Sequence, residues 1–170
     1  MYLCTLLIRK GQVLKLSEQT LNINLPRLPK EGASFSVHID DAFFAAFDNS
    51  DVRKAEVDVN CQVLPKTDKF LLTISANGSM WLPCDRCLDL VEIPVSVEDM
   101  SVVEIGEEDC GDNLFVSEKE GILELAPVIY DILITNLPLT VRHRQGECNP
   151  EMERLLQAHL AKTEAEEPEE

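Results

Sequence analysis

A strict alternation of apolar and polar side chains runs through the middle of the chain and limits what it can fold into. In AEVDVNCQVL (residues 55–64), every second side chain is apolar, namely Val57, Val59, Cys61 and Val63. This two-residue period is typical of a strand with one buried face. FLLTISANGSMWL (residues 70–82) reads as a second strand, and the polar turn between the two predicts a β-hairpin. The dipeptide Asn77-Gly78 predicts a bulge or a bend in the second strand.

The segments that follow supply a third strand and a helix. Residues 89–105 continue as an extended segment that Pro94 breaks or places at a sheet edge. In residues 122–139 apolar side chains recur at spacings of three and four, which predicts an amphipathic helix from about Glu124 to Thr135. We expect an α+β fold in which a mainly antiparallel β-sheet, or a partly closed barrel, packs against this helix near the C-terminus. The expected core joins helix and hairpin through Leu125, Ile129, Ile132, Leu133, Val57, Val59, Val63, Leu72 and Ile74.

Shorter elements are predicted on either side of this central part. Residues 14–25 partly alternate like a strand, residues 25–34 read as a loop, and residues 34–40 read as a strand. A short helix is predicted over residues 40–48, with Asp40 or Asp41 as its N-cap, and another after Pro150. We expect residues 1–160 to form a single α+β domain. Residues 161–170, which include five acids, predict a disordered acidic tail.

The chain is strongly acidic. Its 31 Asp and Glu residues against 15 Lys and Arg residues give a formal net charge of −16. This balance argues against a free-standing nucleic-acid binder driven by charge and favours a partner that is itself basic. Glu98 to Asp112 predict a solvated acidic loop, and we expect this segment to be the docking surface for such a partner.

The apolar segments are too short to cross a membrane, because none approaches the roughly 18 residues of a spanning helix. The apolar run near the N-terminus lacks the basic leader and small-residue cleavage site of a signal peptide. We therefore expect a cytoplasmic protein with reduced thiols and no membrane partner. A disulfide framework is not expected, because the six cysteines are irregularly spaced in a long chain.

Two cysteines at a CxxC spacing, Cys84 and Cys87, lie in LPCDRCLDL between the second and third predicted strands. A thioredoxin-like redox couple would instead open a helix after a strand. A turn between strands suits half of a zinc site, because both sulfurs can point to one centre, and His143 and Cys148 would complete a Cys₃His set. The alternative is that the two cysteines are small buried side chains and that His143 lies on the surface. The sequence leaves both interpretations open.

The remaining candidate residues carry less specific signals. Arg142 and Arg144 form a dense basic spot where a nucleic-acid phosphate could bind, and the alternative is a solvated turn whose arginines pair with nearby acids. Cys61 lies on the apolar face of its strand and is expected in the core, whereas Cys4 and Cys110 have no partner at a suitable spacing. No phosphate-cradling glycine motif and no catalytic constellation is present, so we do not expect an enzyme.

Two motifs in the expected order resemble the bacterial YceD family, which is named for the accumulation of large-subunit ribosomal RNA. The family's C-x-R-C-L is similar to Cys84, Arg86, Cys87 and Leu88. Its helix is similar to the segment that supplies Leu125, Ala126, Ile129, Asp131, Ile132, Leu133, Leu137 and Pro138. The resemblance covers about Val57 to Cys148, and this chain has His143 and Cys148 where some relatives carry cysteines.

The resemblance implies a non-enzymatic factor in the biogenesis of the large ribosomal subunit. Its implied partners are large-subunit ribosomal proteins or pre-rRNA, without a small-molecule substrate. The alternative function is a thiol redox or metal-handling protein that uses the CxxC at Cys84 and Cys87.

Overall fold

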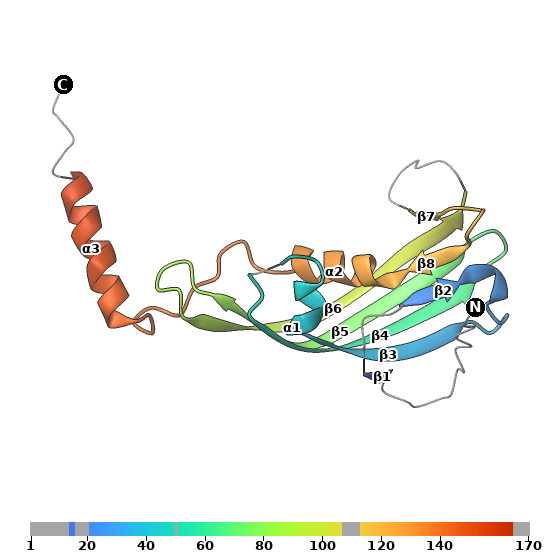
Figure 1. Cartoon of the computed structure of the whole chain (residues 1–170), viewed down its shortest axis with the longest axis horizontal. Helices are drawn as coiled ribbons and strands as arrows, with labels where there is room; N and C mark the ends of the chain where they lie inside the picture. Colours follow the sequence, from blue (N-terminus) through green and yellow to red (C-terminus); the bar gives the residue numbers. More distant parts are fainter. Residues whose placement is uncertain (1–13, 16–20, 50, 107–112, 165–170) are drawn as a thin grey trace, which may run out of the picture.

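The structure is a computed structural model, and it describes residues 14–15, 21–49, 51–106 and 113–164. Its main layer is a six-stranded sheet with strand order β1-β3-β4-β5-β6-β7. The long central strands are β3 (Ala33–Asp40), β4 (Lys54–Pro65), β5 (Phe70–Pro83) and β6 (Leu90–Ile105). They are antiparallel to one another, whereas the short β1 (Leu14–Lys15) and β7 (Leu114–Val116) add in parallel at the two ends. The sheet is therefore open, so the predicted α+β fold with a mainly antiparallel sheet is confirmed, and of the two predicted arrangements it is the sheet and not the barrel (Figure 1).

The predicted hairpin is confirmed. β4 and β5 pair without interruption from Lys54 opposite Trp81 to Pro65 opposite Phe70. The alternating residues of β4 are fully buried on one side, as the two-residue period predicted. The predicted bulge at Asn77-Gly78 is wrong, because the register passes through both residues. Gly78 is required there for another reason: a Cβ on this residue would overlap the backbone carbonyl oxygen of Glu56.

The third predicted strand is confirmed as β6, and it is not broken at Pro94, which pairs with Ser79 of β5. The expectation of an acidic loop beginning at Glu98 is wrong for residues 98–105, which belong to the same strand. Every second residue there faces the core side, and Val103 is fully buried, so packing outweighs the local acidity. Residues 107–112, the rest of the predicted loop, lie outside the described part.

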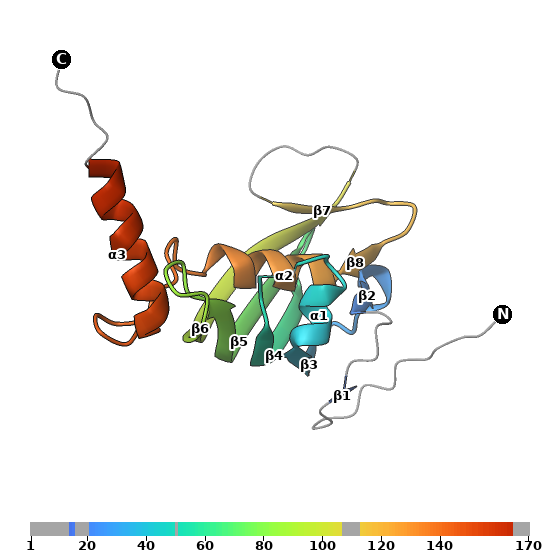
Figure 2. The same ribbon diagram turned by 60° about the vertical axis from the view of Figure 1, so that its left-hand side comes forward.

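Two helices cover one face of the sheet (Figure 2). α1 (Asp41–Ala45) is capped by Asp40, whose side chain accepts hydrogen bonds from the backbone of Ala42 and Phe43. α2 (Leu125–Thr135) is the predicted amphipathic helix and ends at Asn136. Tyr130 of α2 stacks on Phe47 at 4.4 Å and accepts a hydrogen bond from Asn49 at 3.0 Å. These contacts join α2 to the segment that directly follows α1.

The core is one apolar cluster between the helices and the sheet. Leu125, Ile129 and Leu133 are buried, whereas Ile132 is half-buried at the margin. The residues predicted to face them, namely Val57, Val59, Val63, Leu72 and Ile74, are all fully buried in the same cluster. A second, separate cluster of buried cysteines lies at the opposite end of the sheet from β7.

The terminal parts were predicted less well. Within residues 14–25 the described residues form two strands, β1 and β2 (Asn22–Asn24), and β2 pairs with β8 (Ile122–Glu124). The predicted loop after it begins with a short 3-10 turn at Leu25–Arg27. The helix after Pro150 is confirmed as α3 (Pro150–Glu164), which projects from the end of the sheet (Figure 1). It continues beyond residue 160, where the predicted tail begins, and residues 165–170 lie outside the described part. The single-domain boundary stays a prediction.

Within the described ranges, no helix has the length and apolarity that crossing a bilayer requires.

We predict that Gly78→Ala destabilises the fold by at least about 2 kcal/mol, because the added Cβ collides with backbone atoms that cannot move aside. Gly106→Ala is the matched control, since a Cβ on Gly106 meets open space. Urea unfolding of the full chain measures both. Equal midpoints for the two variants would contradict the close approach of β4 to β5 at Gly78.

Candidate metal centre

The CxxC forms the turn that joins β5 to β6. The backbone of Cys84 donates to the carbonyl of Asp89 at 2.8 Å, and Leu88 donates back to the carbonyl of Cys84 at 3.0 Å. Leu88 adopts a positive φ of 65° and is 67% exposed. This conformation costs a bulky residue about 1 kcal/mol, so the turn must be held by other contacts. The cysteines therefore lie between two strands, as predicted, and do not open a helix.

The segment that follows α2 returns to this turn. Asp85 donates its backbone N–H to the carbonyl of Val141 at 2.8 Å, and its carboxylate accepts the N–H of Val141 at 2.9 Å. These reciprocal bonds bring His143 and Cys148 against the turn. Sequence reasoning missed Asp85. A short acidic side chain inside a turn signals only a local backbone hydrogen bond, whereas the partner of Asp85 lies 56 positions away.

Four side chains from the two segments converge. The ligand atoms of Cys84, Cys87, His143 and Cys148 all lie within 4.8 Å of one another. The Sγ atoms of Cys84 and Cys148 are 3.9 Å apart, and Cys87 Sγ lies 3.3 Å from His143 Nδ1. The three cysteines are free and buried, at 0%, 3% and 7% exposure for Cys84, Cys87 and Cys148. All four residues predicted from the sequence are thus brought together.

His143 is oriented by a second contact. Its Nε2 lies 3.2 Å from the carbonyl oxygen of Leu90, the first residue of β6. A carbonyl can only accept, so Nε2 carries the proton of the neutral ring, and Nδ1 presents a lone pair to the cysteines. Metal-binding histidines typically donate their second ring nitrogen to a carbonyl or carboxylate in this way.

The electrostatics among the four side chains favour one thiolate. Burial raises the pKa of Cys84, but the backbone N–H groups of Cys87, His143 and Arg86 outweigh it and lower the pKa to about 6. Burial and the neighbouring sulfurs of Cys84 and Cys87 raise the pKa of Cys148 to about 11. Hydrogen bonding to Cys84 raises the pKa of His143. Crowding of several thiolates is therefore unfavourable unless a cation joins them.

The donor set and spacing fit a tetrahedral metal ion. Zinc–sulfur bonds of about 2.3 Å place two tetrahedral sulfurs about 3.8 Å apart, and a sulfur and a nitrogen about 3.6 Å apart. The observed separations of 3.9 Å and 3.3 Å are close to these values. The arrangement is therefore compatible with a metal site in which the four residues are the ligands.

The other candidate residues lie apart from this cluster or beside it. Arg142 and Arg144 flank His143 and are exposed, and within the described residues neither forms an ion pair with an acid. Cys61 is in the core as predicted, and burial raises the pKa of its thiol to about 12. Cys4 and Cys110 lie outside the described residues.

Comparison with known proteins identifies the family. A family model described as "Large ribosomal RNA subunit accumulation protein YceD" matches residues 72–170. No curated protein and no solved structure matches the chain. The matched range covers more than half of the 170 residues and includes most of β5, all of β6, α2 and α3, and all four residues of the cluster. The chain belongs to the YceD family.

Proposed function

We propose that this chain is a non-catalytic factor in the biogenesis of the large ribosomal subunit, and that it acts in the cytoplasm by binding large-subunit ribosomal proteins or pre-rRNA. The observation that carries the proposal is the family match, which includes the whole four-residue cluster. The net charge of −16 supports a partner with basic surface, because opposite charges steer association. Contact with RNA would then be confined to a local basic patch.

Zinc is the proposed occupant of the cluster, held by Cys84, Cys87, His143 and Cys148. Three thiolates and one imidazole form a closed ligand set, as in structural zinc sites, and leave no open position for a substrate. The proposed role of the ion is mechanical. It fixes the β5–β6 turn to the segment that leads into α3, and so holds the surface at this end of the molecule in one arrangement.

Arg142 and Arg144 are the proposed phosphate contacts. Both are exposed on either side of His143, so a bound metal would also fix their backbone. Arg86, on the CxxC turn, is exposed at the same end of the molecule. Guanidinium groups on an ordered backbone are suited to binding phosphate oxygens.

A thiol redox function for Cys84 and Cys87 is the alternative. A redox couple needs one sulfur that a substrate disulfide can reach. Both side chains are buried, and their sulfurs face His143 and Cys148, with Cys84 Sγ 3.9 Å from Cys148 Sγ and Cys87 Sγ 3.3 Å from His143 Nδ1. The geometry therefore supports metal binding better than disulfide exchange.

We predict that the chain, purified without chelator, contains about one zinc ion, and that Cys84→Ser removes it. Removing zinc from the wild-type chain should lower the melting temperature by roughly 10 °C, because loss of the ion releases the two segments. Atomic emission spectroscopy and calorimetry measure these quantities.

Cys61→Ser is the matched control for that experiment, since Cys61 is a buried cysteine far from the cluster in the structure. This variant should keep its zinc even if its stability falls. Metal-free wild-type protein with an unchanged melting temperature on chelation would contradict the zinc assignment and leave the family role intact. Fast disulfide exchange by the zinc-loaded chain would favour the redox alternative.

We predict that ultraviolet crosslinking in growing cells recovers large-subunit rRNA with the tagged chain, and that a double substitution, Arg142→Gln with Arg144→Gln, lowers the yield severalfold. The matched control is Arg27→Gln with Arg53→Gln, which removes the same charge from two exposed arginines elsewhere. Recovery of neither rRNA nor large-subunit proteins at low salt would refute the proposed function. An equal yield from both double variants would refute the assignment of the two arginines.

A further inference from the structure

The outer edge of β6 is open along most of its length. β6 pairs with β5 from Leu90 to Val103, but on its other side it meets β7 only from Val103 to Ile105. Within the described part of the chain, no strand pairs with the outer side of Leu90–Val102. An unpaired edge of this length offers a row of backbone donors and acceptors to another strand.

The hydrogen bonds at the two ends of β6 show which groups face this edge. Cys84 donates to the carbonyl of Asp89 on the β5 side, and Gly106 donates to the carbonyl of Val116 on the β7 side. Because backbone groups alternate along a strand, odd residues bond to β5 and even residues point outward. The contact of the Leu90 carbonyl with His143 agrees with this assignment.

Pro94 falls on the outward set, so its missing N–H removes nothing from the β5–β6 ladder. It also limits the usable edge, because an added strand finds no donor there. The part of the β6 edge that remains available to an added strand lies between Pro94 and the residues that pair with β7. Its outward N–H groups belong to Ser96, Glu98, Met100 and Val102.

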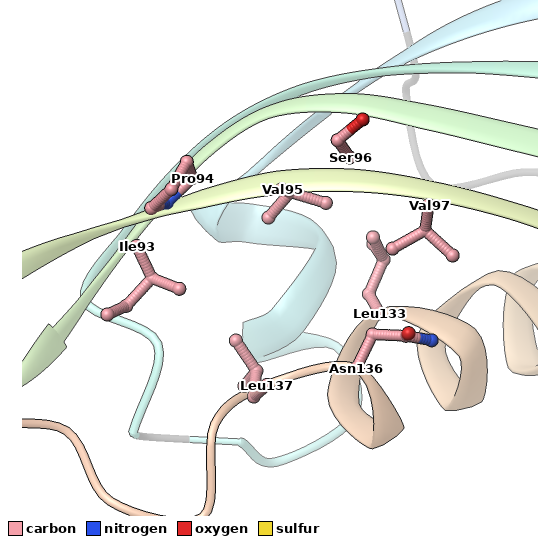
Figure 3. Close-up of a pocket in the computed structure, with 8 residues that line it drawn as sticks. All are labelled: Ile93, Pro94, Val95, Ser96, Val97, Leu133, Asn136 and Leu137. Atoms are coloured by element: carbon pink, nitrogen blue, oxygen red, sulfur yellow. The ribbon is translucent and has the colours of Figure 1, made fainter.

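A small pocket, walled mostly by aliphatic side chains but with polar groups at its opening, lies beside this edge, between β6 and the C-terminal end of α2 (Figure 3). It has a volume of about 100 Å³, and Ile93, Val95 and Val97 point into it from the strand. Leu133 and Leu137 close it from the helix side, with Asn136 at its rim. Pro94 and Ser96 point to the opposite face of the sheet. One aliphatic side chain of an added strand would fit beside this pocket.

The charges along the edge select the partner. Residues 87–118 contain no Lys, Arg or His. On the face opposite the pocket, Glu92 and Glu98 are exposed, and Met100 beside them is 66% exposed. Side chains directly across a strand pair interact, so an added strand is favoured when it places basic residues on this face.

We propose that the β6 edge from Ser96 to Val102 binds an extended segment of a basic protein, in which Lys or Arg residues alternate with aliphatic residues. The segment joins the sheet as a new strand through its backbone, directs a basic side chain to Glu98, and anchors one aliphatic side chain at the pocket. This mode of binding rests on the geometry of β6. Only the identification of the partner as a large-subunit ribosomal protein rests on the proposed function.

The experiment uses the full chain and the fluorescein-labelled peptide acetyl-Lys-Val-Lys-Val-Lys-Val-Lys-amide, with binding followed by fluorescence anisotropy. Two further probes carry a single N-methyl group, one on a central lysine and one on a central valine. In an added strand only one of these two classes of amide faces β6. One probe should therefore lose at least about tenfold in affinity while the other binds like the parent peptide.

Hydrogen exchange in the same complex locates the peptide. Exchange should slow at the outward amides of Ser96, Glu98, Met100 and Val102, and change little at the intervening residues, which already bond to β5. Glu98→Gln should weaken binding about two- to fivefold through the lost cross-strand charge pair. Glu120→Gln is the matched control, because Glu120 is exposed outside β6 and should leave the affinity unchanged.

Three outcomes overturn the proposal. The first is that both N-methyl probes bind equally or that both fail, because a strand addition must discriminate between them. The second is that the parent peptide shows no binding at millimolar concentration. The third is that sedimentation shows the chain dimerising through β6, in which case a second copy is the occupant. Each outcome is independent of whether crosslinking recovers ribosomal components, so failure here is distinct from failure of the proposed function.

Discussion

The junction between the β5–β6 turn and the segment after α2 determines the arrangement of one whole end of the molecule. Asp85 and Val141 lie 56 positions apart in sequence and are joined by two hydrogen bonds. The Cys₃His cluster lies directly beside these bonds. Bringing the two segments together costs chain entropy that the contacts between them must help to offset. The strained backbone at Leu88 also needs contacts between the two segments, because such a conformation persists only where surrounding contacts hold it. A metal ion that joins all four ligands would meet both demands.

This junction also explains how the chain presents two different surfaces. At the cluster end, exposed arginines lie on segments whose positions the junction fixes, although the chain as a whole carries a net charge of −16. Along β6, beyond the turn, the described surface is acidic and its backbone edge is open. The Leu90 carbonyl links the two regions, because it begins β6 and also orients the His143 ring. A change in the cluster would therefore be transmitted first to the start of the open strand.

The sequence allowed prediction of those parts in which local pattern and burial agree. The alternation in residues 55–64 predicted β4 because its apolar side chains are all buried on one face, and the three-four spacing predicted α2 for the same reason. Residues 98–105 of the acidic segment were predicted to be a loop but belong to β6. This part of the strand depends on pairing with Phe70–Ser75 of β5, a tertiary interaction that composition does not reveal. Gly78 was predicted to form a bulge. Glycine is required there because the backbone of the neighbouring strand comes too close to leave room for a side chain.

Some features of the candidate site could likewise be predicted from the sequence, and others could not. The two cysteines at CxxC spacing were a local signal that left metal binding and simple burial both open, and the chemistry of tetrahedral sites pointed to His143 and Cys148. Asp85 and the Leu90 carbonyl could not be identified, because their roles exist only once distant segments meet.

The most direct test of this account is X-ray absorption spectroscopy at the zinc edge on the chain purified without chelator. Three sulfurs at about 2.3 Å and one nitrogen at about 2.0 Å around the metal are the predicted result. A first shell without one nitrogen and three sulfurs, or no bound zinc at all, would contradict it.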